Sequence, residues 1–128
     1  MSLDARIRHA GFVTIVELSG RIVLGEECVW LGKLVSDLLE RGDNKILLDL
    51  ADVHRIDTAG LARIFSGMVS VRKRDGDLKL LHPRKDFQNV LEITRMLSVL
   101  DTSHDEGAAI KSFVESARGR SAVSFHGA

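Results

Sequence analysis

The chain has 128 residues, which is enough for one domain with its own apolar core. Basic and acidic side chains number 18 each, and this balance argues against a protein that binds nucleic acid or anionic membranes. The single cysteine excludes a fold held by disulfides within the chain, and no apolar run approaches the roughly 20 residues that cross a bilayer. The N-terminus also lacks the apolar core of a signal peptide, so we expect a cytoplasmic protein without membrane insertion.

Alternating apolar residues from Phe12 to Leu18 predict a strand, and Ile7 marks a weaker strand before it. Ala10-Gly11 and Ser19-Gly20 interrupt the pattern on either side. We therefore expect a short antiparallel ribbon at the N-terminal end of the fold.

A helix is predicted next, because apolar residues recur at helical spacing at Leu31, Leu34, Val35 and Leu38. Glu26 and Glu27 stand where the positive end of its dipole would lie, and Arg41-Gly42 closes it. Cys28 and Trp30 fall in this helix, and we expect Trp30 to be half-buried in the core.

Three short apolar runs predict the remaining strands. Ile46–Leu50 is nearly unbroken and too short for a helix, which is typical of a parallel strand that is covered on both faces. Leu78–Leu81 predicts a second such strand, and Val99-Leu100 a short last one.

Helices are predicted between and after these strands. The second helix has an apolar stripe formed by Leu61, Ile64, Phe65 and Met68. Gly76 is interpreted as the C-terminal stop of this helix, and Pro83 as the opening residue of a third helix. Ser103 and Glu106 form a capping box that predicts the start of a fourth helix, whose stripe extends to Ala117.

Strands that alternate with helices require crossover connections and so a largely parallel sheet. We expect a single mixed α/β domain over residues 1–117. Its sheet has four to five mostly parallel strands and an N-terminal antiparallel ribbon, and about four helices pack on it. Residues 118–128 are small, polar and basic, and we expect a flexible C-terminal tail there.

Ligands and partners of such sheets meet the loops beyond the carboxyl ends of the parallel strands. Two predicted loops qualify, Ala51–Asp57 and His82–Lys85. Asp57 is a good N-cap for the second helix, and Ile56 and Leu61 occupy the positions of a hydrophobic staple around it.

The segment Asp49–Leu61 resembles the signature of STAS domains, the module shared by sulfate transporters and anti-sigma factor antagonists. In that family an Asp-Leu strand end leads through a short loop into Asp-Ser/Thr-Ser/Thr/Ala-Gly-Leu, which Asp57-Thr58-Ala59-Gly60-Leu61 matches. The resemblance continues through Gly76–Leu81, Pro83 and Val90–Thr94, and it covers about residues 12 to 115.

The resemblance implies a small bacterial regulator without catalytic activity or cofactor. Such antagonists bind an anti-sigma factor that is also a serine/threonine kinase of the histidine-kinase-like ATPase fold, and this binding releases a sigma factor. The kinase phosphorylates a hydroxyl in the signature turn and breaks the complex, and a serine/threonine phosphatase resets the switch. Whether the chain also forms a homodimer is left open.

On this chain the resemblance assigns the phosphorylated hydroxyl to Thr58, because the second hydroxyl position of the turn is Ala59. The predicted partner-binding residues are Asp52, His54, Arg55, Asp57, Thr58, Ala59, Gly60 and Arg63. Ser66 and Ser70 extend this surface along the second helix, and Arg84 or Lys85 could pair with the phosphate. Ala59 also leaves open a constitutive binder that has lost phosphoregulation.

Three alternatives stay open. One is a STAS scaffold or transport-accessory subunit that works without phosphorylation. Another is a phospho-accepting receiver using Asp49 or Asp52, although Ser19-Gly20-Arg21 lacks the acidic pair that would hold magnesium. The third is a small enzyme built on Cys28 and His54, since Cys28 lies in a first helical turn that would favour a thiolate. The five histidines show no metal-ligand spacing, so no metal is expected.

Overall fold

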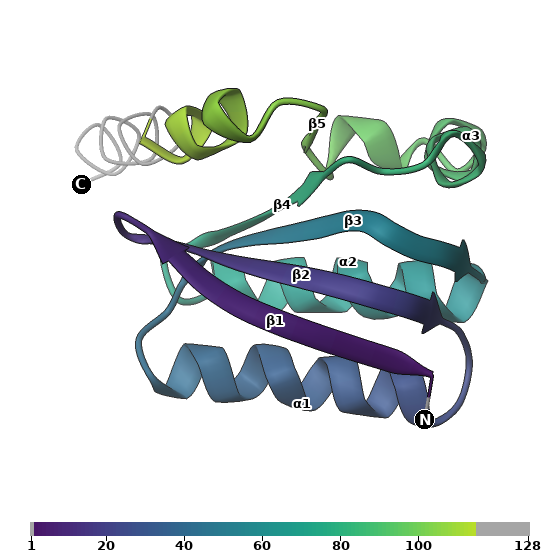
Figure 1. The fold of residues 1–128 in the computed structure, drawn as a ribbon, viewed down its shortest axis with the longest axis horizontal. Helices are drawn as coiled ribbons and strands as arrows, with labels where there is room; N and C mark the ends of the chain where they lie inside the picture. Colours follow the sequence, from purple (N-terminus) through teal and green to yellow (C-terminus); the bar gives the residue numbers. More distant parts are fainter. Residues whose placement is uncertain (1, 115–128) are drawn as a thin grey trace.

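Five strands form one mixed sheet in the computed structural model, which describes residues 2–114 except for the side chain of Leu97 (Figure 1). The strands are β1 (Leu3–Ala10), β2 (Val13–Ile22), β3 (Lys45–Ile56), β4 (Asp77–Leu81) and β5 (Thr102–Ser103). They lie in chain order, with β1 antiparallel to β2 and the other neighbours parallel. The predicted fold class is confirmed, whereas the predicted domain end at residue 117 and the tail lie outside the described residues.

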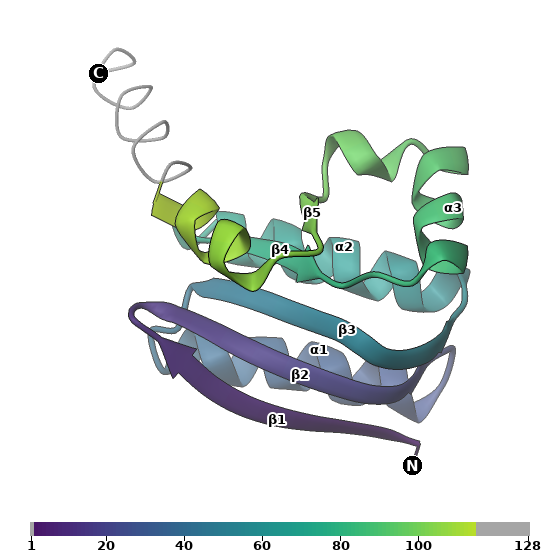
Figure 2. The same ribbon diagram turned by 45° about the horizontal axis from the view of Figure 1, so that its top comes forward.

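The helices cover the two faces of the sheet unequally. Helices α1 (Glu26–Glu40) and α2 (Thr58–Arg72) lie side by side on one face, and α3 (Lys85–Ile93) follows β4 (Figure 1). A fourth helix, residues 106–114 of the described chain, packs on the opposite face (Figure 2). No helix among residues 2–114 is long and apolar enough to cross a membrane.

Strand β3 carries apolar side chains on both faces, as its sequence predicts. Ile46, Leu48 and Leu50 belong to the large core beneath α1 and α2. Leu47 points the other way, into a smaller core that includes Phe113 of the last helix. Burial of both faces explains why this strand lacks the alternation of polar and apolar residues that a half-exposed strand shows.

The end of β3 corrects the sequence prediction. Residues 51–56 were expected to form a loop, but the strand continues to Ile56. The extension has a partner because β2 also continues through Ser19-Gly20, with a register irregularity there, and pairs as far as Ile22 with Ile56. Gly20 makes this passage possible: its φ is 116°, and a β-carbon would lie 1.9 Å from the carbonyl oxygen of Ser2.

Several other predicted boundaries were wrong. Phe12 lies in the turn between β1 and β2 and is exposed rather than part of the strand. Pro83 precedes the N-cap of α3, which is Arg84. Residues 99–100, which were predicted to form the last strand, instead lie between a short 3₁₀ helix, Met96–Ser98, and β5.

The two predicted helix-end signals at Gly76 and Ser103 also act differently. Helix α2 ends at Arg72, and the left-handed residue that follows it is Asp75, with φ of 60°. Gly76 instead allows close approach, because a β-carbon there would lie 1.8 Å from the carbonyl oxygen of Asn44. Ser103 belongs to β5, and Asp105 accepts the N–H of Gly107 at the start of the last helix.

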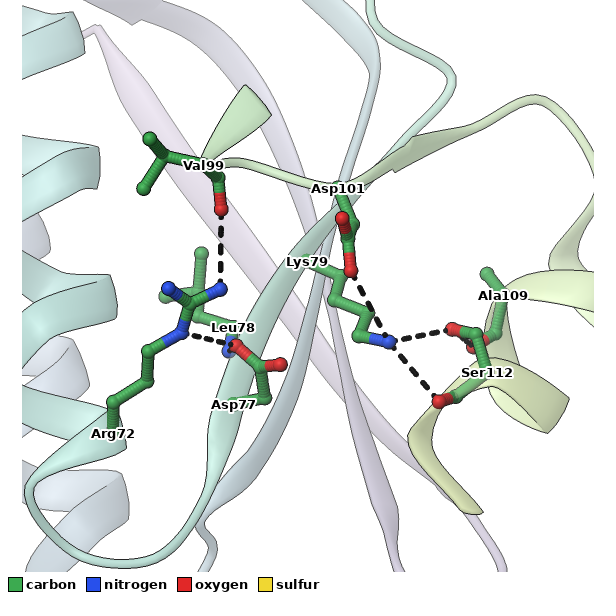
Figure 3. Close-up of polar contacts among 8 residues, drawn as sticks. All are labelled: Arg72, Asp77, Leu78, Lys79, Val99, Asp101, Ala109 and Ser112. Carbon is green, nitrogen blue, oxygen red and sulfur yellow. Dashed lines mark hydrogen bonds and ion pairs between the residues drawn. The ribbon is translucent and has the colours of Figure 1, made fainter. Parts of the chain in front are cut away.

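A buried lysine connects the sheet to the last helix (Figure 3). Lys79 on β4 is only 3% exposed, and its Nζ donates to the carbonyl oxygen and the hydroxyl of Ser112 at 3.1 and 2.9 Å. The same Nζ lies 3.4 Å from a carboxylate oxygen of Asp101 and 5.0 Å from the ring centre of Phe113. A buried charge that is paired and hydrogen-bonded in this way fixes how the helix lies on the sheet.

Candidate functional site

The signature segment forms the junction between β3 and α2. Asp57 is the N-cap of α2, and its Oδ1 accepts the N–H of Gly60 at 2.8 Å, as the sequence predicts. On either side of this cap, Leu61 belongs to the core and the partly buried Ile56 packs against it. The cap therefore fixes the orientation of the first turn of α2 relative to the sheet.

Asp57 has a second partner that the sequence does not reveal. Its Oδ2 accepts the N–H of Leu24, in the loop between β2 and α1, at 3.0 Å. The hydrogen bonds from Leu24 and Gly60 lower the pKa of Asp57 below its usual range, with a smaller contribution from the charge of Arg55. One ionised carboxylate thus connects the starts of two helices.

Gly60 allows the two segments to approach each other closely. A β-carbon at this position would lie 2.0 Å from the carbonyl oxygen of Ile22, at the end of β2. The backbone N–H of Asp57 also donates to that carbonyl, at 3.4 Å. The glycine of the signature is therefore explained by packing of α2 against β2.

Thr58 is the first residue of α2, and its side chain is exposed. The positive end of the α2 dipole favours a negative group here, whereas the adjacent carboxylate of Asp57 opposes it. Ala59, the position without a hydroxyl, is half-buried.

Two exposed apolar side chains that we had not predicted belong to the same edge of the molecule. Leu24 precedes the N-cap Gly25 of α1 and is 77% exposed, and Val29 lies in the first turns of that helix and is 69% exposed. Helices α1 and α2 start at the same edge of the sheet (Figure 1). The sequence signal was available, because positions 24 and 29 have the spacing of a hydrophobic staple around Gly25.

The exposure predicted along α2 is found for its two serines but not for its arginine, and partner binding there stays a prediction. Ser66 and Ser70 are exposed. Arg63 is half-buried and lies against α1, where a β-carbon on Gly32 would be 2.8 Å from its Nη1. Arg63 therefore packs against α1 instead of standing free in solvent.

The remaining predicted site residues are divided between two places. His54, Arg55 and Arg84 line a small hollow between the end of β3 and the start of α3. Asp52 lines a separate acidic groove together with Asp49, on the sheet face that α1 and α2 do not cover. Thr58 lines neither of them, so the pairing of its phosphate with Arg84 or Lys85 stays a prediction.

Cys28 does not have the environment of a reactive thiol. Its side chain is buried, and its Sγ donates to the carbonyl oxygen of Val23 at 3.1 Å. Burial, together with the nearby charge of Asp57, raises the pKa of Cys28, so the expectation that the helix start would favour the thiolate was wrong. Within residues 2–114, no three His, Cys, Asp or Glu side chains are placed to hold a metal ion.

The junction between β3 and α2 lies within a segment that matches a known protein family. The family model of the STAS domain matches residues 4–109, which is most of the chain. A Thermotoga neapolitana protein that is named as a candidate anti-sigma factor antagonist is 38% identical over 69 residues. That alignment covers 52% of this chain and 61% of the relative, so the chain matches about three fifths of the relative's length.

Solved structures share the fold. The crystal structure of a candidate anti-sigma factor antagonist from Thermotoga maritima superposes with a TM-score of 0.76 at 24% identity, over 85% of this chain and 93% of that one. The Bacillus cell fate determinant SpoIIAA in its phosphorylated form superposes with a TM-score of 0.65 at 14% identity, over 85% and 99% of the two chains.

Proposed function

The chain belongs to the STAS domain family, and from this premise we propose that it is an anti-sigma factor antagonist whose binding is switched off by phosphorylation at Thr58. Its partner is an anti-sigma factor that is also a serine/threonine kinase of the histidine-kinase-like ATPase fold. Binding this partner releases a sigma factor, and a serine/threonine phosphatase restores the binding form.

One observation carries the proposal: Thr58 is exposed at the first residue of α2, directly after the Asp57 cap. The neighbouring residues of the match to the family signature, Ala59 and Gly60, are half-buried or buried and hold the backbone in place. Among the five signature residues 57–61, Thr58 is the one with a hydroxyl group. The names of the relatives support the general role, and the solved structures with this fold include SpoIIAA in its phosphorylated form.

The switch acts through local charge. A phosphate on Thr58 adds about −1.5 to −2 charges at pH 7, next to the ionised carboxylate of Asp57. The first turn of α2 offsets part of this repulsion, by about 0.3–1 kcal/mol, so the fold persists. A protein docked over the same turn would enclose that charge in a desolvated contact, which costs several kcal/mol and dissociates the complex.

Radiolabelling tests the assignment of the hydroxyl. The anti-sigma factor kinase from the same genome is incubated with labelled ATP and with the wild-type chain, Thr58→Ala or Ser36→Ala. Ser36 is a matched control, because it is an exposed hydroxyl residue on a helix, α1, and is not part of the predicted partner-binding surface. We expect label on the wild type and on Ser36→Ala and none on Thr58→Ala. Equal labelling of Thr58→Ala would remove Thr58 from the mechanism, and no labelling of any chain would favour a phosphorylation-independent scaffold.

A further inference from the structure

The hollow between β3 and α3 combines buried apolar side chains with an exposed basic edge. Its volume is about 80 Å³, and Val53 and Phe87 are the buried side chains that line it together with Leu50. His54, Arg55 and Arg84 also line it and are exposed. The hollow thus offers an apolar interior and cations around it.

Its size limits what can enter. A cavity of roughly 150 Å³ holds one benzene molecule, and pockets for cofactors or nucleotides measure roughly 300–1,000 Å³. At about 80 Å³, the hollow accommodates a single aliphatic side chain. A nucleotide or a drug-sized ligand does not fit it.

The cations at the hollow form no ion pair. Arg55 and Arg84, which line it, and Lys85, which follows Arg84 in the chain, are exposed and take part in no ion pair within the described part of the chain. Two arginines elsewhere in the described chain do form ion pairs, Arg8 with Glu106 and Arg72 with Asp77. One carboxylate, that of Asp86, is present at this edge.

Two of these cations also stand where they weaken their own helix. Arg84 is the N-cap of α3, and Lys85 is its first residue. The positive end of a helix dipole favours acidic residues and disfavours basic ones. A local arrangement that opposes stability in this way is expected where a site serves a function.

We propose that this hollow, bordered by Arg55 and Arg84, binds an acidic segment of a partner protein, with one aliphatic side chain in the hollow and flanking carboxylates on the arginines. The occupant follows from charge complementarity, since the arginine fork pairs well with carboxylates. The inference rests on the proposed function, because Arg55 lies three residues before Thr58 in the same junction. A phosphate on Thr58 then repels the same acidic segment, which gives the switch a second point of action.

A peptide titration followed by NMR tests the site without the natural partner. The probe is a five-residue acetylated peptide amide, with leucine at its centre and two acidic residues on each side. We expect amide shifts concentrated at residues 53–56 and 84–90. Reversal of both charges, in Arg55→Glu with Arg84→Glu, should weaken binding at least about tenfold. Arg74→Glu is the matched control, because Arg74 is exposed after the far end of α2, and it should bind like the wild type.

Two further probes separate the contribution of the apolar hollow from that of the basic side chains around it. A peptide with serine in place of leucine should bind several-fold more weakly if the hollow takes an aliphatic group. Inorganic phosphate at the same concentrations should not reproduce the shifts. The proposal is overturned if the peptide does not bind, if the shifts map elsewhere, if the reversed variant binds like Arg74→Glu, or if phosphate alone gives the same shifts.

The anti-sigma factor kinase distinguishes this inference from the proposed function. If the wild type binds the kinase and the double charge reversal binds it equally well, the acidic-segment site is wrong while the proposed function stands. If the peptide binds at the hollow but the wild type does not bind the kinase, the site stands and the proposed function fails.

Discussion

The carboxylate of Asp57 accepts the backbone N–H of Leu24, which lies 33 residues earlier in the chain, at 3.0 Å. The other oxygen of the same carboxylate caps α2 through Gly60. The loop that presents the exposed side chain of Leu24 is therefore held by the residue next to Thr58. A change in charge at Thr58 acts directly on the group that connects these two segments.

Removing this carboxylate should destabilise the fold. Asp57→Ala deletes the cap and leaves the N–H of Leu24 without its acceptor, so we expect a loss of about 1–2 kcal/mol in the free energy of unfolding. Asp57→Asn retains one carbonyl oxygen and should lose less. Urea unfolding measures both, and hydrogen exchange at the Leu24 amide should accelerate in Asp57→Ala. An alanine variant as stable as the wild type would contradict the connection.

The same carboxylate makes stability depend on pH in one direction. Because the pKa of Asp57 is lowered in the folded chain, its contribution is fully present above the unfolded value of about 3.9 and is lost as the pH falls through the folded value. Glu27 and Glu106 also have lowered pKa values, through backbone hydrogen bonds and through Arg8 respectively. The contribution of Asp57 is therefore isolated as the stability difference between wild type and Asp57→Asn.

We expect this difference to be constant between pH 5 and 7 and to shrink below about pH 4. Urea unfolding of both proteins over that range provides the measurement. A difference that grows as the pH falls would mean that the folded state raises the pKa of Asp57, against the observed hydrogen bonds.

Two glycines of α2 should respond to alanine in opposite ways. In Gly60→Ala the new β-carbon would meet the carbonyl oxygen of Ile22, a backbone atom that cannot move aside, so we expect severe destabilisation or failure to fold. In Gly67→Ala the nearest atom would be 3.7 Å away, and alanine should stabilise the helix by about 0.5–1 kcal/mol. Thermal unfolding of both variants checks this, and equal effects would contradict the close approach at Gly60.

Cys28 should react slowly with thiol reagents. Its side chain is buried, and its raised pKa keeps it protonated at neutral pH. Iodoacetamide at pH 8 should modify the folded chain far more slowly than the chain in denaturing urea. Reaction at the rate of the unfolded chain would show that the thiol is accessible. It would also revive the hypothesis of a small enzyme that uses Cys28.

The elements with strong local patterns were predictable from the sequence. The stripe of α1, the double-faced run of β3 and the Asp57 cap each depend on neighbours within a few residues. The extension of β3 to Ile56 was not predictable in this way, because its hydrogen-bond partners come from β2 through the irregularity at Gly20. The predicted loop was therefore a strand.

In the candidate site too, features set by neighbouring residues were predictable and features set by distant segments were not. The exposed position of Thr58 follows from the cap and the register of α2. The bond from Leu24 to Asp57 and the proximity of Arg84 to Arg55 depend on how distant segments meet, and local pattern contains no signal for them. Cys28 was misjudged for the same reason, since its burial and the nearby charge of Asp57, 29 residues later, arise only in the folded chain.

The affinity of the chain for its anti-sigma factor kinase, with and without phosphate on Thr58, tests the central proposal most directly. Calorimetry with the unmodified chain, the Thr58-phosphorylated chain and Thr58→Ala gives the three dissociation constants. We expect the unmodified chain and Thr58→Ala to bind alike, and the phosphorylated chain to bind at least about 100-fold more weakly. Equal affinities for the phosphorylated and unmodified chains would contradict the proposal that charge at the start of α2 controls the complex.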